Sequence, residues 1–127
     1  MADYKPEVTF TIATGQSLSD IVTQFTRYAL IAIQTPSTLT APAASPTGVF
    51  FVQFRGAFTL AGNYNIIKNS SGIFTLEVQT GTAFSFAIDP VNFAGYPFVK
   101  AEIVEAAGGA VVPQTGAKTL AGKMYEV

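Results

Sequence analysis

Three acidic residues near one predicted turn are the side chains best suited to chemistry. Asp89, Glu102 and Glu105 fall within or just beyond residues 80–104. Two nearby carboxyl groups can serve a glycosidase, and a cluster of carboxylates can bind calcium. Asp89 precedes a proline, however, where aspartate commonly starts a turn, and the two glutamates follow a strand pattern that predicts exposure to solvent. We therefore favour structural roles for all three and predict no catalytic residue and no metal-binding residue.

The residue types on which most hydrolases and zinc proteins depend are missing from the sequence. The chain contains neither histidine nor cysteine. It therefore has no imidazole base, no thiol nucleophile, no disulfide and none of the common zinc ligand sets. Neither the P-loop pattern nor the dinucleotide-binding glycine pattern occurs. We predict a protein that is not an enzyme and uses no cofactor.

Sugar, nucleic acid and membrane binding are all disfavoured by the distribution of side chains. The chain has eleven phenylalanines, which are mostly core residues, and no tryptophan. Its five tyrosines are scattered along the sequence, which gives no sign of a sugar-stacking platform. The seven basic residues are scattered as well, whereas phosphate recognition needs a basic patch. No apolar run reaches the roughly 18 residues needed to span a bilayer.

The composition favours association with other proteins. Hydrophobic residues make up 49% of the 127 residues, charged residues 12%, and the formal net charge is −1. Ordinary soluble chains carry about 25% charged residues, and a net charge near zero promotes association. The length fits a single domain over residues 1–127. The first residues lack the pattern of a signal peptide, so we expect synthesis in the cytoplasm and assembly into an oligomer.

The predicted elements are organised around a corner between two strands, 83–88 and 97–104. Alternation places Phe84, Phe86 and Ile88 on one face of the first strand. A proline then stops the ladder, and a glycine ends one short helical turn. We expect the two aromatic side chains of this turn to be buried across one end of the core. The structural corner consists of Asp89, Pro90, Phe93, Gly95 and Tyr96.

The rest of the sequence predicts an all-β protein. Alternation over residues 8–13 places Val8, Phe10 and Ile12 on one face. Further strands are predicted at 18–26, 28–34, 49–55, 64–68, 73–80 and 118–127, with a hairpin turn at 69–72 and the last strand at a sheet edge. Eight or nine short strands without a long helix indicate an antiparallel β-sandwich that is jelly-roll-like.

Two segments are predicted to lie outside the sandwich: an N-terminal arm, residues 1–7, and a proline-rich loop, residues 35–48. Proline cannot serve inside a ladder, and both segments have few bulky side chains to bury. A proline-restricted segment loses less entropy on docking, which suits a strap across a neighbouring protein. For the loop, a disordered connector is an equally good interpretation. The predicted contact residues are Tyr4, Lys5, Pro6, Pro36, Leu39, Pro42 and Pro46.

Three sequence segments carry a resemblance to a known family. They are residues 15–19 (GQSLS), residues 30–36 (LIAIQTP) and residues 87–95 (AIDPVNFAG). In order and spacing they resemble a family of small tailed-bacteriophage proteins encoded near the head genes. Residues 112–118 (VPQTGAK) are similar to the end of that pattern.

The resemblance implies a structural virion protein, similar to capsid decoration (cement) proteins. Such a protein would bind the major capsid protein across capsomer seams. Because it would bind only the assembled shell, it would raise the apparent stability of that shell. A homotrimer would match the three-fold positions of a shell. We expect the protein on the capsid surface of the virion. The alternative is a carbohydrate- or receptor-binding β-sandwich of a phage tail or fibre, which would be present in far fewer copies.

Overall fold

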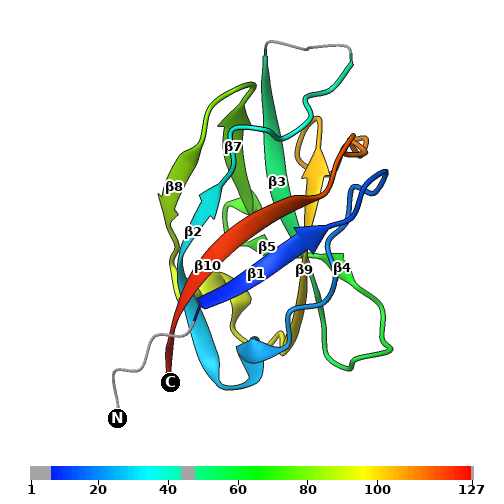
Figure 1. Cartoon of the computed structure of the whole chain (residues 1–127). Helices are drawn as coiled ribbons and strands as arrows, with labels where there is room; N and C mark the ends of the chain where they lie inside the picture. Colours follow the sequence, from blue (N-terminus) through cyan, green and yellow to red (C-terminus); the bar gives the residue numbers. More distant parts are fainter. Residues whose placement is uncertain (1–6, 44–47, 127) are drawn as a thin grey trace.

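Two antiparallel β-sheets pack face to face (Figure 1), which confirms the predicted all-β sandwich. The computed structural model describes residues 7–43 and 48–126. Sheet A has the strand order β1-β10-β2-β8. Its strands are β1 (Glu7–Ile12), β10 (Lys118–Glu126), β2 (Tyr28–Thr35) and β8 (Phe84–Ala87).

Sheet B is built around β3 (Val49–Ala57). One side of β3 pairs with β9 (Phe98–Val104). The other side pairs first with β7 (Thr75–Gln79) and then with β4 (Asn65–Ile66). Because β4 and β7 follow one another along the same side of β3, they act as a single interrupted strand.

A small hairpin causes this interruption. It consists of β5 (Lys68–Asn69) and β6 (Gly72–Ile73), so the predicted hairpin turn is confirmed. The described residues contain ten strands rather than eight or nine: the predicted strands 64–68 and 73–80 are each divided in two, and the predicted strand 18–26 is not among the ten. The divisions fall at Ile67, which is fully buried, and at Phe74, which packs against the core.

The predicted strand over residues 18–26 is correct only in part. Residues 17–22 follow the free edge of β9: the Ser19 N–H donates to the Ala101 carbonyl (2.8 Å), and the Val22 N–H donates to the Val99 carbonyl (2.9 Å). The Ala101 N–H, however, donates to the Ser19 hydroxyl (2.8 Å) instead of to a carbonyl. This side-chain acceptor breaks the regular ladder. Beyond it, Gln24–Thr26 form the 3₁₀ turn η1.

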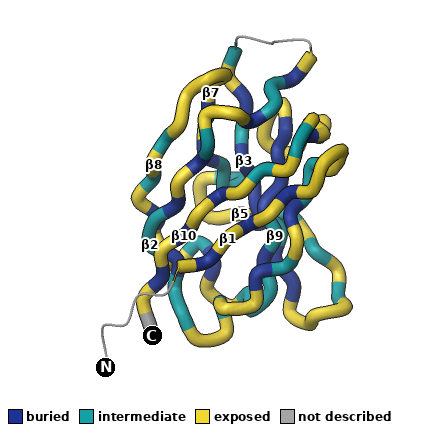
Figure 2. Tube along the Cα trace, viewed as in Figure 1, coloured by how far each residue is buried: buried dark blue, intermediate teal, exposed yellow. Residues whose placement is uncertain are grey.

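The core lies between the two sheets and is rich in phenylalanine. Figure 2 shows buried and exposed positions alternating along β1, as the sequence predicts. Phe54 of β3 is fully buried, with its ring centroid 5.7 Å from that of Phe10 and 5.2 Å from that of Phe93. Phe93 ends the 3₁₀ turn η2 (Pro90–Phe93) and is 4% exposed. The predicted burial of Phe93 is therefore confirmed.

Strand β10 does not lie at a sheet edge, and that prediction is wrong. It pairs with β1 on one side and with β2 on the other. Its alternate residues Leu120, Gly122 and Met124 face the core. A Cβ at Gly122 would lie 2.9 Å from side-chain atoms of both Leu30 and Val8, so a glycine here permits close packing within the core.

The proline-rich loop buries more of itself than the sequence predicts. Leu39 is 6% exposed and belongs to the core, and Pro42 is buried too. Gln114 holds this stretch in place, because its side-chain oxygen accepts from the Thr40 N–H (2.7 Å). The prediction that the loop has little to bury in its own domain is therefore wrong for Leu39 and Pro42. Tyr4, Lys5, Pro6 and Pro46 lie outside the described residues.

Candidate functional site

The three acidic residues considered as chemical groups do not form a cluster. The Asp89 side chain accepts from the Val91 N–H (3.1 Å) and caps η2, the turn role predicted for it. Glu102 is buried in β9, whereas Glu105 is exposed just after that strand. Across residues 7–43 and 48–126, no group of three or more acidic residues is placed to hold a metal ion.

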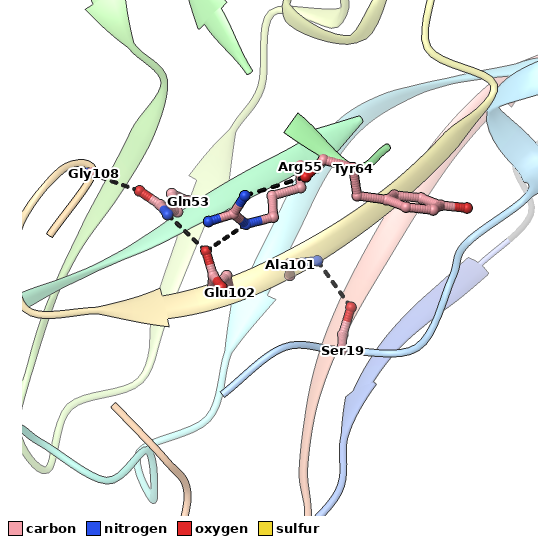
Figure 3. Close-up of polar contacts among 7 residues, drawn as sticks. All are labelled: Ser19, Gln53, Arg55, Tyr64, Ala101, Glu102 and Gly108. Atoms are coloured by element: carbon pink, nitrogen blue, oxygen red, sulfur yellow. Dashed lines mark hydrogen bonds and ion pairs between the residues drawn. The ribbon is translucent and has the colours of Figure 1, made fainter. Parts of the chain in front are cut away.

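The prediction that Glu102 faces solvent is wrong, since it is 5% exposed. Its carboxylate accepts from the Gln53 side-chain amide (2.7 Å) and from the Arg55 guanidinium (2.8 Å), as Figure 3 shows. The cover over this part of sheet B comes from the loop after β9. There the Gly108 N–H donates to the side-chain oxygen of Gln53 (2.9 Å), which is itself 1% exposed.

The same polar network holds the loop between β3 and β4, residues 58–64. The Arg55 guanidinium also donates to the Tyr64 carbonyl (3.1 Å), and the Lys100 ammonium lies over the Tyr64 ring, 4.6 Å from its centroid. The Tyr64 hydroxyl in turn donates to the Leu60 carbonyl (2.8 Å). The buried Glu102 is thus connected through Arg55 and Tyr64 to the loop 58–64, which lies near Phe98, where β9 begins (Figures 1 and 3).

That loop presents apolar side chains to solvent. Phe58 is 75% exposed and Leu60 is 56% exposed. The Phe58 ring is parallel to the Tyr96 ring, with 3° between the planes and 5.7 Å between the centroids. Tyr96 is half-buried rather than buried, which corrects the prediction for this corner residue. Its ring lies against Gly56, where a Cβ would be 2.7 Å from the ring carbons.

A shallow hollow of about 120 Å³ opens beside these two rings. We call it the aromatic hollow. It is lined by Gly56, Ala57, Phe58, Asn63, Asn65, Ile66 and Tyr96. Sequence reasoning missed this site because its aromatic residues are distant in the chain. They meet because Ala57 pairs with Phe98 at the end of the β3–β9 ladder. The predicted strand stops at residue 55, whereas β3 continues through Gly56 to Ala57, so the pairing that brings the two rings together was not foreseen.

A second candidate surface is the outer face of sheet A. Among the described residues of that face there is one ion pair, between the Lys123 ammonium and the Glu7 carboxylate (2.9 Å). The Lys123 hydrogen bond and positive charge lower the pKa of the Glu7 carboxyl. The other exposed side chains of these strands are uncharged and, apart from Gln34 and Tyr125, small: Thr9, Thr11, Gln34, Ser85, Ala87, Thr119, Ala121 and Tyr125. The half-buried Ala32 lies on the same face. A hollow of about 340 Å³ lies on this face between β1 and β8.

The outer face of sheet A offers contact area and little reactive chemistry. Its carboxylate and its ammonium are bonded to each other, and the Gln34 amide donates to the Ser85 hydroxyl (3.1 Å). Small side chains on four neighbouring strands let another backbone approach closely. This surface is therefore suited to covering or being covered by another protein.

Comparison with protein-family models, with curated proteins and with solved structures finds no match to this chain. The resemblance to phage head-region proteins therefore stays a prediction. Within the part of the chain that the structure describes, no helix is long and apolar enough to cross a membrane.

Proposed function

We propose that this chain is a structural virion protein that decorates a tailed-phage capsid and stabilises it by binding the major capsid protein across capsomer seams. The sequence resemblance in residues 15–19, 30–36 and 87–95 suggests the biological setting. The outer face of sheet A is the observation that best supports the physical part of the proposal.

Both the charge and the shape of this face favour contact with another protein. Charged groups are depleted at the centres of protein interfaces, because burying a charge without a partner is expensive. On this face, the charges of Glu7 and Lys123 are already paired with each other. Because the neighbouring Ala32, Ala121 and Ser85 are small, docking would require little loss of side-chain entropy.

This proposal places the shell contact on the sheet rather than on the proline-rich loop. Of the described residues predicted to touch the shell, Leu39 and Pro42 are buried within this chain and Pro36 is half-buried. Side chains already packed in their own core have little area to offer to a partner. We also propose a homotrimer, for which sedimentation of the isolated protein is the direct measurement.

We also propose that the sandwich is a jelly roll. Its support is the order in which the chain visits the two sheets when residues 17–22 are counted as the edge strand beside β9. Among the described strands, the chain then passes to the opposite sheet at nearly every connection. The exceptions are the connection from β3 to β4 and the one from β4 through the β5–β6 hairpin to β7, which both begin and end in sheet B. Repeated crossing between sheets is typical of double Greek-key sandwiches.

A charge introduced on the outer face of sheet A tests the proposed contact. We expect Ala121→Glu to weaken co-sedimentation with assembled shells that lack this protein by at least about tenfold. The new carboxylate would be buried at the interface, and Lys123, the cation that shares this hollow, is already paired with Glu7. Ala94→Glu is the matched control, since Ala94 is an exposed alanine in the corner after η2. Thermal melting must show that both variants are folded. Equal binding of Ala121→Glu and wild type would show that this face is not the contact.

A further inference from the structure

We infer that the aromatic hollow is a binding site for the ring of a neutral sugar. This inference goes beyond the proposed function, because it concerns the opposite sheet and a ligand other than the capsid protein. It rests on two parallel rings, on two side-chain amides beside them, and on the rigid support of the loop that carries them.

The two rings form the apolar part of the site. Phe58 is 75% exposed, and its plane lies 3° from that of Tyr96. A centroid separation of 5.7 Å between parallel rings is an offset arrangement. Each ring therefore leaves part of its face uncovered by the other. The C–H face of a pyranose ring is flat and apolar, and it packs well on such a surface.

Asn63 and Asn65 supply the polar part. Both line the hollow and are exposed, and no hydrogen bond joins either side-chain amide to another described residue. An amide both donates and accepts hydrogen bonds, which matches the hydroxyl groups at the edge of a sugar ring. The aromatic rings thus match the apolar C–H face of a sugar, and the two amides match the hydroxyl groups at its edge.

The charge around the hollow indicates a neutral ligand. None of the residues that line it is ionisable at neutral pH. The nearby Arg55 is paired with Glu102 (2.8 Å), and the Lys100 ammonium lies over the Tyr64 ring. A charged ligand would find no partner of opposite sign among the lining residues and would lose solvation on binding.

The site is largely organised before a ligand arrives. Hydrogen bonds from Arg55 to the Tyr64 carbonyl and from Tyr64 to the Leu60 carbonyl fix the loop. Tyr96 lies against the backbone at Gly56, where a side chain would displace it. Binding would therefore order few new groups, which reduces its entropic cost.

An NMR titration of the isolated protein tests this inference. The probes are methyl glucoside, methyl galactoside, methyl mannoside and N-acetylglucosamine. For at least one of them we expect saturable, millimolar shifts of the Asn63 and Asn65 side-chain amides. Phe58→Ala should weaken that binding at least about tenfold, and it should fold, because Phe58 is exposed. The control is Val111→Ala, an exposed apolar residue bridged to the opposite end of β9, which should leave the affinity unchanged.

Three results would overturn the inference: no saturable shift with any of the four sugars, shifts that avoid the hollow, or unchanged affinity in Phe58→Ala. Loss of particle binding in Phe58→Ala without any sugar binding would identify the hollow as a protein contact instead. Because the titration uses no particles, its outcome is independent of whether the protein decorates a capsid.

Discussion

At the scale of single residues, Glu102 has the most unusual environment. It is 5% exposed, yet its carboxylate is paired with Arg55, whose side chain is 28% exposed. Removing one partner of such a pair leaves the other charge poorly solvated. The partial exposure of Arg55 moderates this effect, since water reaches the guanidinium.

We expect Glu102→Gln to lower the free energy of unfolding by about 1–3 kcal/mol, the range for losing charge-assisted hydrogen bonds in a buried site. The matched control is Glu105→Gln, an exposed position on the same chain segment, which should change stability by less than about 0.5 kcal/mol. Urea denaturation of both variants gives the comparison. Equal stabilities would show that the buried carboxylate contributes nothing beyond its shape.

The burial of Glu102 could not be read from the sequence. Alternation along residues 98–104 correctly places Lys100 and Glu102 on the same side of β9, and the local pattern indicates exposure for both. The cover comes from Gly108, whose N–H reaches Gln53 on a strand far away in the sequence. Such a contact depends on how a loop folds back over the sheet, which periodicity does not encode.

The exposed ion pair on sheet A predicts a small pH effect. Lys123 lowers the pKa of the Glu7 carboxyl in the folded protein. A lowered pKa means that the pair stabilises the fold above the unfolded-state pKa of Glu7, and that this contribution is lost as the pH falls through the folded-state pKa.

NMR titration of the Glu7 carboxyl should therefore give a lower pKa in the wild type than in Lys123→Met. Added salt should narrow the difference, because both side chains are exposed and screening weakens the attraction. An identical pKa in the two proteins would mean that the ion pair does not persist in solution.

At the scale of elements, the corner around η2 is the part that the sequence predicted best. Asp89 caps the turn, Pro90 begins it, and Gly95 adopts a φ of +90°, a conformation that favours glycine. These features are local, so residue types alone indicate them. The interior position of β10 and the irregular edge strand at 17–22 are not local, because they depend on which strands become neighbours.

We expect Phe93→Ala to destabilise the protein by about 3–5 kcal/mol, because it removes a buried ring from the core. The Phe93 ring centroid lies 5.1–5.7 Å from those of Phe25, Phe54 and Phe74. Val91→Ala in the same turn is the control: Val91 is 67% exposed, so its truncation should change stability little. Thermal melts that ranked the two variants in the opposite order would contradict the assigned role of the corner.

At the scale of the whole molecule, the two outer faces differ in chemistry. The face of sheet A has mostly small side chains and one ion pair among its described residues. The face of sheet B carries a buried polar network and ends at the aromatic hollow. The sequence predicted the sandwich from its alternation. It could not predict this division, because each face gathers residues from strands that are separated in the chain.

The number of copies per particle tests the proposed function most directly. A protein that covers capsomer seams must be present in hundreds of copies, whereas a tail or fibre module is needed in few. Densitometry of purified virions, calibrated against the major capsid protein, measures this ratio. We predict a copy number in proportion to the three-fold positions of the shell; a handful of copies per virion would contradict the decoration proposal.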